Sequence, residues 1–369
     1  MSTSNLKQSP GLAIVRALVS LVPLSLTVLL LVWGMFFIRS VQGGKNPLPQ
    51  YVIIIIALIW GVGGIVLLFF TGDIVIEQLP EKWSHRLEPI LFVGPALLML
   101  TWALVLPTIR TLIASFYDQI SQNFVGWKNY IYVFTNPSMI EVFRNNLLWL
   151  IFGTVFTVTA GLLIAVLADR SKFENAAKSV IFLPMAISFV GAGIIWNFVY
   201  AARPIDAPQI GLLNAIVVAF GGQSQPWTAF FQPWNNFFLI VVEIWLQTGF
   251  AMVLFSAAIK GIPSEILEAA RVDGANDIQV FFRIMLPSIA GTIITVTTTI
   301  VIFTLKIFDV VWVMTGGQFG TSVIGTEFYR QYFTYNQNGI GSAIAVVLFI
   351  TVIPVMVYNL RQFARREAM

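Results

Sequence analysis

Eight long apolar segments, each bounded by charged residues, constrain this chain more than any other feature. A helix that crosses the hydrocarbon core of a bilayer needs about 20 apolar residues at a rise of about 1.5 Å each. The segments are residues 17–38, 51–70, 89–109, 145–168, 179–202, 237–259, 288–314 and 340–360. The pattern predicts an all-α integral membrane protein with eight transmembrane helices. Residues 211–220 are also apolar but too few to cross, so we expect a surface or re-entrant helix there.

The composition agrees with a membrane protein and argues against several classes of enzyme. Charged residues make up 10% of the chain, against about a quarter in soluble domains. There is no cysteine, and His85 is the single histidine, which leaves almost nothing for a metal site or a catalytic triad. The sequence also lacks GxxxxGK[ST], the phosphate-binding loop of many ATPases. We therefore expect no catalytic residues, no metal ligands and no bound cofactor in this chain.

Basic residues are distributed unevenly between the two sides of the membrane. Eight spans place both termini on one side, where thirteen Lys and Arg residues fall, against seven on the other side. Cytoplasmic loops usually carry the excess of basic residues. We therefore expect both termini in the cytoplasm. The first span has no obvious small-residue cleavage site, so we expect a retained anchor and not a signal peptide.

The cytoplasmic loop over residues 260–287 is patterned for two short helices joined by a corner. Glycine and proline end the sixth span, a serine is a candidate cap for the first helix, and an Asp-Gly turn follows it. An asparagine and a glutamine form a capping pair for a second helix that ends before Pro287. A slim corner of this kind suits insertion into a groove of another protein. The residues are Gly261, Pro263, Ser264, Asp273, Gly274, Asn276 and Gln279.

The same loop resembles the EAA signature, EAAxxDGAxxxxxFxxIxLP, of permease subunits of binding-protein-dependent ABC importers. Every fixed position is filled. Residues 124–130, 211–214 and 308–317 are similar to the FxGxxNY, GLLN and FDxxxxxTGG stretches of the sugar-permease branch, although Gln318 replaces the proline that follows TGG in the family. The signature residues are Glu268, Ala269, Ala270, Asp273, Gly274, Ala275, Phe281, Ile284, Leu286 and Pro287.

The resemblance implies a six-helix importer core over residues 88–369, preceded over residues 1–87 by two additional helices and a linker, as in the larger maltose-type subunit. It implies a transport subunit of the bacterial inner membrane, not an enzyme, that moves a di- or oligosaccharide or related glycoside by alternating access. The implied partners are a second permease subunit, two cytoplasmic ATPases that bind ATP and magnesium, an external sugar-binding protein and membrane lipid, with no nucleic acid. The residues that would contact the ATPase are Glu268, Ala269, Ala270, Asp273, Gly274 and Ala275.

Polar residues within the spans are the candidates for a substrate site, because such groups are costly in lipid and tend to face a cavity or a partner. Glu243, Gln247 and Phe250 are spaced i, i+4 and i+7, so they share one helix face. The resemblance adds sugar contacts at Leu246, Gln247 and Phe250 on the sixth span and at Ile300, Thr304 and Ile307 on the seventh.

The charged residues inside the spans can also serve roles apart from substrate binding. Lys306 and Asp309 are three residues apart, a spacing at which they can pair with each other. Glu243 can pair with Lys306 or face a wetted cavity instead of the substrate. An ion-coupled secondary transporter that uses Glu243 and Asp309 is the alternative function, although no inverted repeat of the kind found in many such carriers is evident.

Overall fold

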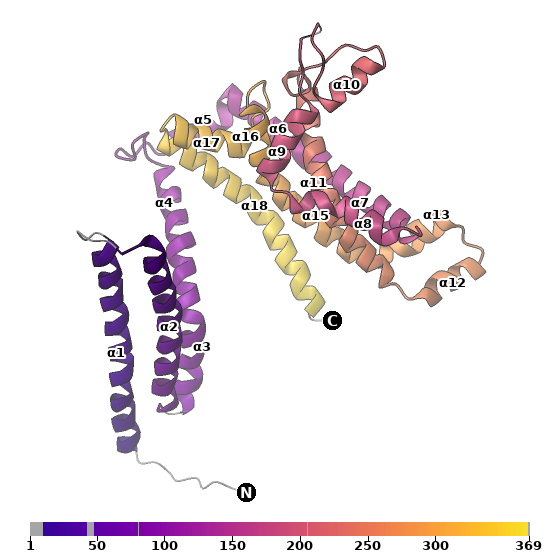
Figure 1. The fold of residues 1–369 in the computed structure, drawn as a ribbon. Coiled ribbons are helices and arrows are strands. Elements are labelled where there is room, and N and C mark those ends of the chain that lie inside the picture. The colour runs from indigo at the N-terminus through magenta and orange to yellow at the C-terminus, as the bar shows by residue number, and fades with distance from the viewer. Residues whose placement is uncertain (1–9, 43–47, 80, 205, 368–369) are drawn as a thin grey trace. The chain divides into compact units, whose positions relative to one another are not determined.

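A computed structural model describes residues 10–42, 48–79, 81–204 and 206–367. These residues form helices, turns and loops, with one isolated β-bridge between Tyr117 and Phe124 and no strand among them. The chain divides into two compact units, residues 1–108 and 109–369 (Figure 1). The predicted all-helical class is confirmed. The predicted division at residue 88 stays a prediction.

The first unit consists of three long helices, α1 (Pro10–Gln42), α2 (Gln50–Glu77) and α3 (Glu81–Leu100). The middle helix, α2, packs against both of the others. Glycine allows a close approach of α1 and α2, since a Cβ atom on Gly34 would lie 1.9 Å from the Trp60 side chain. Many large apolar side chains on these helices are exposed, as lipid-facing side chains are. Two candidate spans cover the first two predicted segments.

The third span is longer than the sequence indicated. From α3 the helix continues through a π-helical stretch, Thr101–Val105, into α4 (Leu106–Ala114), and 33 residues from Lys82 to Ala114 qualify as one span. The prediction took charged residues as the ends of the span. A long basic side chain near a helix end can keep its charge in water while its stem lies along the apolar surface, so a charge need not end the helix.

The central helix of the second unit is α11 (Trp234–Lys260). Of its apolar 18-residue stretch, 56% is buried. Helix α7 (Thr154–Asp169) crosses α11 closely at Gly161. A Cβ atom on Gly161 would lie 2.5 Å from the Cβ atom of Ala251. The helices packed against α11 are α7 (Thr154–Asp169), α8 (Glu174–Phe182), α9 (Phe189–Val199) and α15 (Ala290–Leu305).

Three unbroken spans of this unit match three predicted segments. One combines α6 (Pro137–Leu148), a π-helical stretch and α7 into Pro137–Asp169. The others are α11 and residues Asn338–Arg361 of α18 (Asn338–Glu367). Small residues line the face of α7 that meets α11, so the two helices approach closely.

Two of the predicted spans are not straight. Helices Glu174–Ala186 and Phe189–Val199 meet at 103°, and helices Asp277–Ser288 and Ala290–Leu305 meet at 71°. The first bend follows a turn that contains Pro184, and the Ser188 hydroxyl caps the next helix by accepting from Gly191 N over 3.0 Å. The described residues therefore hold six candidate spans, or eight if each bent pair counts as one. The predicted number of eight is not confirmed.

The seventh predicted span, residues 288–314, is also broken at its far end. Helix α15 stops at Leu305, and a separate short helix, α16 (Asp309–Thr315), starts after Phe308. Side chains at 306–308 therefore lie at a break and not on a regular helical face.

The two ends of the second unit differ in character. The short helices α12 (Ser264–Val272) and α13 (Asp277–Val280) form one end, whereas α5 (Lys128–Thr135), α10 (Leu212–Ala219) and α17 (Ile324–Tyr329) lie at the other (Figure 1). The short helix expected at residues 211–220, as a surface or re-entrant helix, is present as α10. Two of the motifs, residues 124–130 and 211–214, each contribute an asparagine that stabilises the loops at this end. Asn129 donates to Ser115 O and Tyr117 O, and Asn214 donates to Ala201 O and Gln225 O.

Candidate functional site

The loop at residues 260–287 forms the predicted pair of helices with a glycine corner. Helix α12 ends at Val272, and Gly274 turns the chain with a φ of 85°. The predicted capping box at the start of α13 is confirmed, since Gln279 N donates to Asn276 Oδ1 and Asn276 N donates to Gln279 Oε1, both over 2.9 Å. Local sequence rules therefore account for this corner.

Two details of the prediction for this loop are wrong. Ser264 is the first residue of α12 and not its cap, because Pro263 occupies the cap position and no side chain caps the helix. The second helix does not end before Pro287. It continues to Ser288 and then bends at Ile289, because a proline in the middle of a π-helical and α-helical junction removes only one donor.

The signature residues of the corner are open to solvent. Glu268, Ala269, Asp273 and Gly274 are exposed, and only Ala270 and Ala275 are partly buried. The backbone closes the corner by a 3.0 Å hydrogen bond from Ala275 N to Ala270 O. Two apolar side chains beside them, Val272 and Ile278, are also exposed and were not among the predicted residues. The six predicted coupling residues therefore form one projecting surface, which we call the coupling corner.

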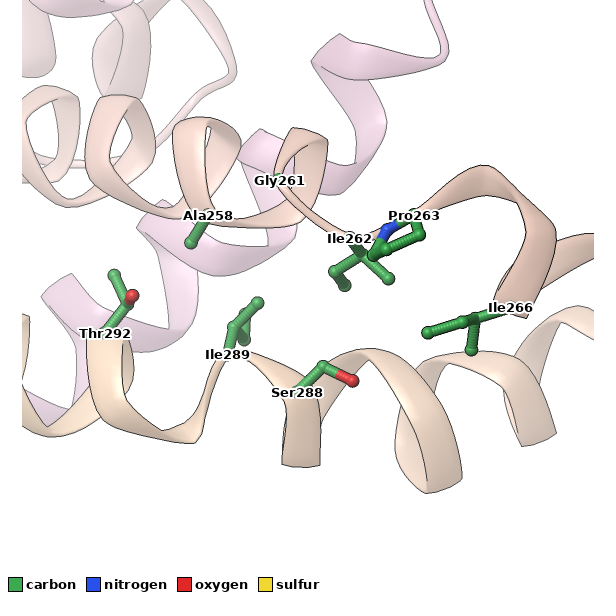
Figure 2. A pocket seen from close by; sticks show the side chains of 8 residues that line it. All are labelled: Ala258, Gly261, Ile262, Pro263, Ile266, Ser288, Ile289 and Thr292. Atoms are coloured by element: carbon green, nitrogen blue, oxygen red, sulfur yellow. The ribbon is translucent and has the colours of Figure 1, made fainter. Parts of the chain in front are cut away.

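A pocket of about 360 Å³ lies behind the coupling corner. Figure 2 shows Ile262 and Pro263, in the connection between α11 and α12, facing Ser288 and Ile289 across it. The main neighbour of α12 is α13. Leu267 and Ala270 of α12 pack against the core. The lining residues are Ala258, Gly261, Ile262, Pro263, Ile266, Ser288, Ile289 and Thr292.

Ion pairs join the core helices next to this corner. Lys178 of α8 pairs with Asp169 of α7 and with Glu174, and Lys260 of α11 also pairs with Glu174. Ser256 donates to Asp169 Oδ1 over 2.7 Å. These contacts tie the ends of three helices together where α11 leads into the coupling corner.

A second, more exposed pair reaches the corner itself. Arg170 Nη1 and Asp277 Oδ2, at the start of α13, are 3.1 Å apart, with side chains 49% and 60% exposed. The Lys178–Asp169 pair is much less exposed, at 17% and 11%. The two pairs are therefore expected to differ in strength.

Lys178→Met is expected to destabilise the protein by about 3–5 kcal/mol, because it leaves a largely buried carboxylate without its cation. Arg170→Met is the matched control and should cost only about 0–1 kcal/mol, since that pair is solvated. Melting temperatures of the two purified variants in the same detergent make the comparison. Equal melting temperatures for both variants and the wild type would contradict a structural role for Lys178.

The acidic residue in the sixth span is paired with a threonine and not with a cation. Glu243 is 1% exposed, and the Thr304 hydroxyl donates to Glu243 Oε1 over 2.6 Å. The other oxygen, Oε2, has no hydrogen-bond partner in the described residues. It lies against Gly153 of the fourth predicted span, where a Cβ atom would be 2.9 Å away. The structure thus brings together two predicted site residues from different helices.

Neither of the two possible pairings of Lys306 is present in this structure. No ion pair joins Lys306 to Asp309 or to Glu243 within the described ranges. Lys306 is exposed and Asp309 is half-buried. The break between α15 and α16 explains the difference, because the i, i+3 geometry of a continuous helix does not exist there.

The remaining predicted substrate residues fall into two groups. Gln247 is 4% exposed, and no hydrogen bond to its amide is formed within the described part of the chain. Phe250, one helical turn away, is half-buried. The apolar members are packed in the core, Leu246 and Ile307 in one cluster and Ile300 in another. Gln247 is therefore a polar group without a partner in this chain, placed near the Glu243–Thr304 pair on α11.

A metal site is not indicated by the geometry. No group of three His, Cys, Asp or Glu side chains is suitably placed among residues 10–42, 48–79, 81–204 and 206–367.

Comparison with known proteins identifies the family. The profile of the family described as binding-protein-dependent transport system inner membrane component matches residues 157–366. The chain belongs to this family. It is a transporter permease subunit of the ABC importer class and not an enzyme.

Two curated relatives extend the match over about three quarters of the chain. The osmoprotective compounds uptake permease protein GgtC of Synechocystis sp. is 53% identical over 277 residues, which are 75% of this chain and 99% of the relative. The alpha-glucoside transport system permease protein AglF of Rhizobium meliloti is 48% identical over 285 residues, or 77% of this chain and 84% of the relative.

A solved structure confirms the permease fold. The chain is similar to a subunit of a bacterial alginate ABC transporter, crystallised in complex with an alginate pentasaccharide-bound periplasmic protein. The TM-score is 0.64 at 21% identity, and the match covers 76% of this chain and 96% of that subunit. At this identity the likeness concerns the fold.

Proposed function

We propose that this permease subunit imports a di- or oligosaccharide or a related glycoside into the cytoplasm by alternating access. It would pair with a second permease subunit, act on two cytoplasmic ATPases that bind ATP and magnesium, and receive its substrate from an external sugar-binding protein. The complex would lie in the bacterial inner membrane with both termini of this chain in the cytoplasm.

The coupling corner carries this proposal. A subunit without a phosphate-binding loop takes its energy from another chain or from an ion gradient. The corner is an exposed protrusion of polar, small and apolar residues at one end of the second unit, as contact with another chain requires (Figure 1). Glu268 and Asp273 offer carboxylates to basic or backbone partners. Val272 and Ile278 offer apolar surface beside them, and interfaces commonly combine the two kinds of contact.

The glycoside class is supported by the names of the relatives and by the candidate site. The relative that is 48% identical is an alpha-glucoside permease. In this chain Gln247 offers an amide to hydroxyl groups, and the ring of Phe250 offers a face to the apolar side of a sugar. The proposed path follows Gln247, Phe250 and Thr304, with Glu243 beside Thr304. Leu246, Ile300 and Ile307 would contribute by shaping its wall.

The alternative of an ion-coupled carrier rests on Glu243 and Asp309. These two carboxylates do not form a cluster with a third ligand among the described residues. One oxygen of Glu243 is already engaged by Thr304. The family match favours the importer over the carrier.

Purification of the tagged full-length chain from membranes in a mild detergent tests the proposed assembly. The expected result is a stable complex with a different permease chain and an ATPase, identified by mass spectrometry, that hydrolyses ATP. A chain that purifies without an ATPase, yet still transports a glycoside after reconstitution, would contradict the proposal.

A further inference from the structure

The loop between α16 and α17 holds a phenylalanine in an unfavourable backbone conformation. Thr321 N donates to Gln318 O over 3.1 Å, which closes a four-residue turn with Phe319 and Gly320 at its centre. Both central residues have positive φ, 57° and 70°, as in a type I′ turn, where Gly, Asn and Asp are favoured. A bulky residue rarely adopts this conformation. We call residues 318–321 the Phe319 turn.

Packing within the subunit does not account for this side chain. Phe319 is 56% exposed and belongs to none of the three apolar clusters formed by the described residues. Asparagine or glycine at this position would relax the backbone without removing a side chain from these clusters. Residues that break a local rule without a gain in packing are expected at functional sites.

Side chains from two other segments hold the turn in place. Asn235, at the start of α11, is fully buried and donates to Phe319 O over 2.6 Å. Asn145 of α6 donates to Gly320 O over 2.8 Å, and Gln232 donates to the same oxygen over 2.6 Å. The direction of the backbone at Phe319 is therefore fixed before any partner binds, and such preorganisation reduces the entropy cost of binding.

The side chains that support the turn belong to a polar network. Gln232 also accepts a hydrogen bond from Arg144 and donates to Glu141 Oε1 over 2.8 Å. On the other side of the loop, Arg330 donates to Gly316 O over 2.9 Å and pairs with Glu327. Phe231 and Trp234, next to Gln232 and Asn235, are also exposed. Exposed aromatic side chains beside charged and amide groups are typical of the anchors of a protein interface.

The position in the fold indicates which partner is involved. The Phe319 turn joins α16 and α17, which lie at the opposite end of the second unit from α12 and α13 (Figure 1). If the coupling corner meets the ATPase in the cytoplasm, the Phe319 turn faces the outside. A soluble protein that docks from outside meets this polar surface first.

We propose that Phe319 is an anchor residue for the external solute-binding protein, inserted into an apolar pocket of that protein when it docks. This inference rests on the proposed function, since it requires an importer fed by such a protein. The Phe319 turn supplies the rigid support, and the surrounding Arg144, Glu141 and Gln232 supply the polar rim.

Site-specific cross-linking in intact cells identifies the partner. A Phe319→p-benzoylphenylalanine variant is irradiated, and the adduct is identified by mass spectrometry. The expected adduct contains a soluble solute-binding protein and increases when the transported glycoside is present. An adduct with lipid or with another membrane subunit, or no adduct, would overturn the proposal.

Binding measurements on the purified complex test the contribution of the ring. The measured quantity is the concentration of solute-binding protein that gives half-maximal stimulation of ATP hydrolysis, with the protein that the cross-linking identified. Phe319→Asn should raise this concentration at least about tenfold. Basal ATP hydrolysis should not change, and the melting temperature should stay equal or rise by about 2–4 °C because the turn relaxes. Phe319→Trp keeps an aromatic anchor and should retain most of the stimulation.

A matched control separates backbone relaxation from loss of the ring. Ser121 is exposed and also has a φ of 57°, so Ser121→Asn relaxes a similar backbone without removing an aromatic side chain. It should leave stimulation unchanged. Normal stimulation in Phe319→Asn would overturn the role of Phe319 but not the proposed function. A wild-type complex that hydrolyses no ATP would contradict the proposed function itself.

Discussion

Gly274→Asp should abolish the stimulation of ATP hydrolysis by substrate while leaving the subunit inserted in the membrane. Gly274 turns the coupling corner with a φ of 85°, and nothing lies within 4 Å of a Cβ atom placed on it. The side chain would therefore cause no clash within this chain. Its effects are a backbone cost of about 1–2 kcal/mol and added bulk and charge on a surface that must fit a groove of the ATPase.

Gly221→Asp is the matched control for this experiment. Gly221 has a φ of 81° and equally open surroundings, but it follows α10 at the other end of the second unit (Figure 1). The same substitution there carries the same backbone cost away from the ATPase. We expect Gly221→Asp to retain stimulated hydrolysis in reconstituted complexes. Equal loss in both variants, or no loss in Gly274→Asp, would contradict a coupling role for the corner.

Gln247→Leu should reduce kcat/KM for glycoside uptake by at least about tenfold, because a hydrogen-bonding group in a buried site contributes about 1–3 kcal/mol. The amide has no partner in the described part of this chain, so its removal leaves no other group of the subunit unsatisfied. The melting temperature should therefore stay equal or rise. Basal ATP hydrolysis should also be retained, since the coupling corner is untouched.

Thr248→Val is the control for Gln247→Leu. The Thr248 hydroxyl donates to Ile244 O, in the preceding turn of the same helix, over 2.6 Å. Its proton is therefore satisfied by the helix itself and is not available to a substrate. Uptake by this variant should remain within about twofold of the wild type, since substitutions that leave no buried group unsatisfied have small effects. Unchanged uptake in Gln247→Leu would remove Gln247 from the substrate path.

The coupling corner shows how much local sequence rules can predict. The positive φ of Gly274 and the capping box of Asn276 and Gln279 depend on residues within a few positions of one another, and both are present in the structure. The end of the second helix was mispredicted because Pro287 is tolerated within the chain of short helical stretches that reaches Ser288.

The bends in the spans were missed because charges alone were used to define the segments. Pro184 and the capping serine Ser188 are signals in the sequence for the first bend. The 71° bend at Ile289 follows Pro287, which is a comparable signal, and it lies next to the predicted boundary between the second short helix and the seventh span.

The membrane site was only partly predictable. Spacing along one helix correctly grouped Glu243 with Gln247, but the partner of Glu243 is Thr304, which is 61 residues away. A pairing with Lys306 was considered because opposite charges attract. The structure instead places Lys306 on an exposed break. The buried amides that hold the Phe319 turn come from α6 and from the start of α11, and only the fold brings them together.

Uptake of labelled glycoside into proteoliposomes tests the central claim most directly. The purified complex is reconstituted with and without ATP enclosed, with and without the solute-binding protein, and with an imposed proton or sodium gradient. The importer predicts uptake only when ATP, the ATPase and the binding protein are all present. Uptake driven by the gradient in the absence of ATP would contradict it.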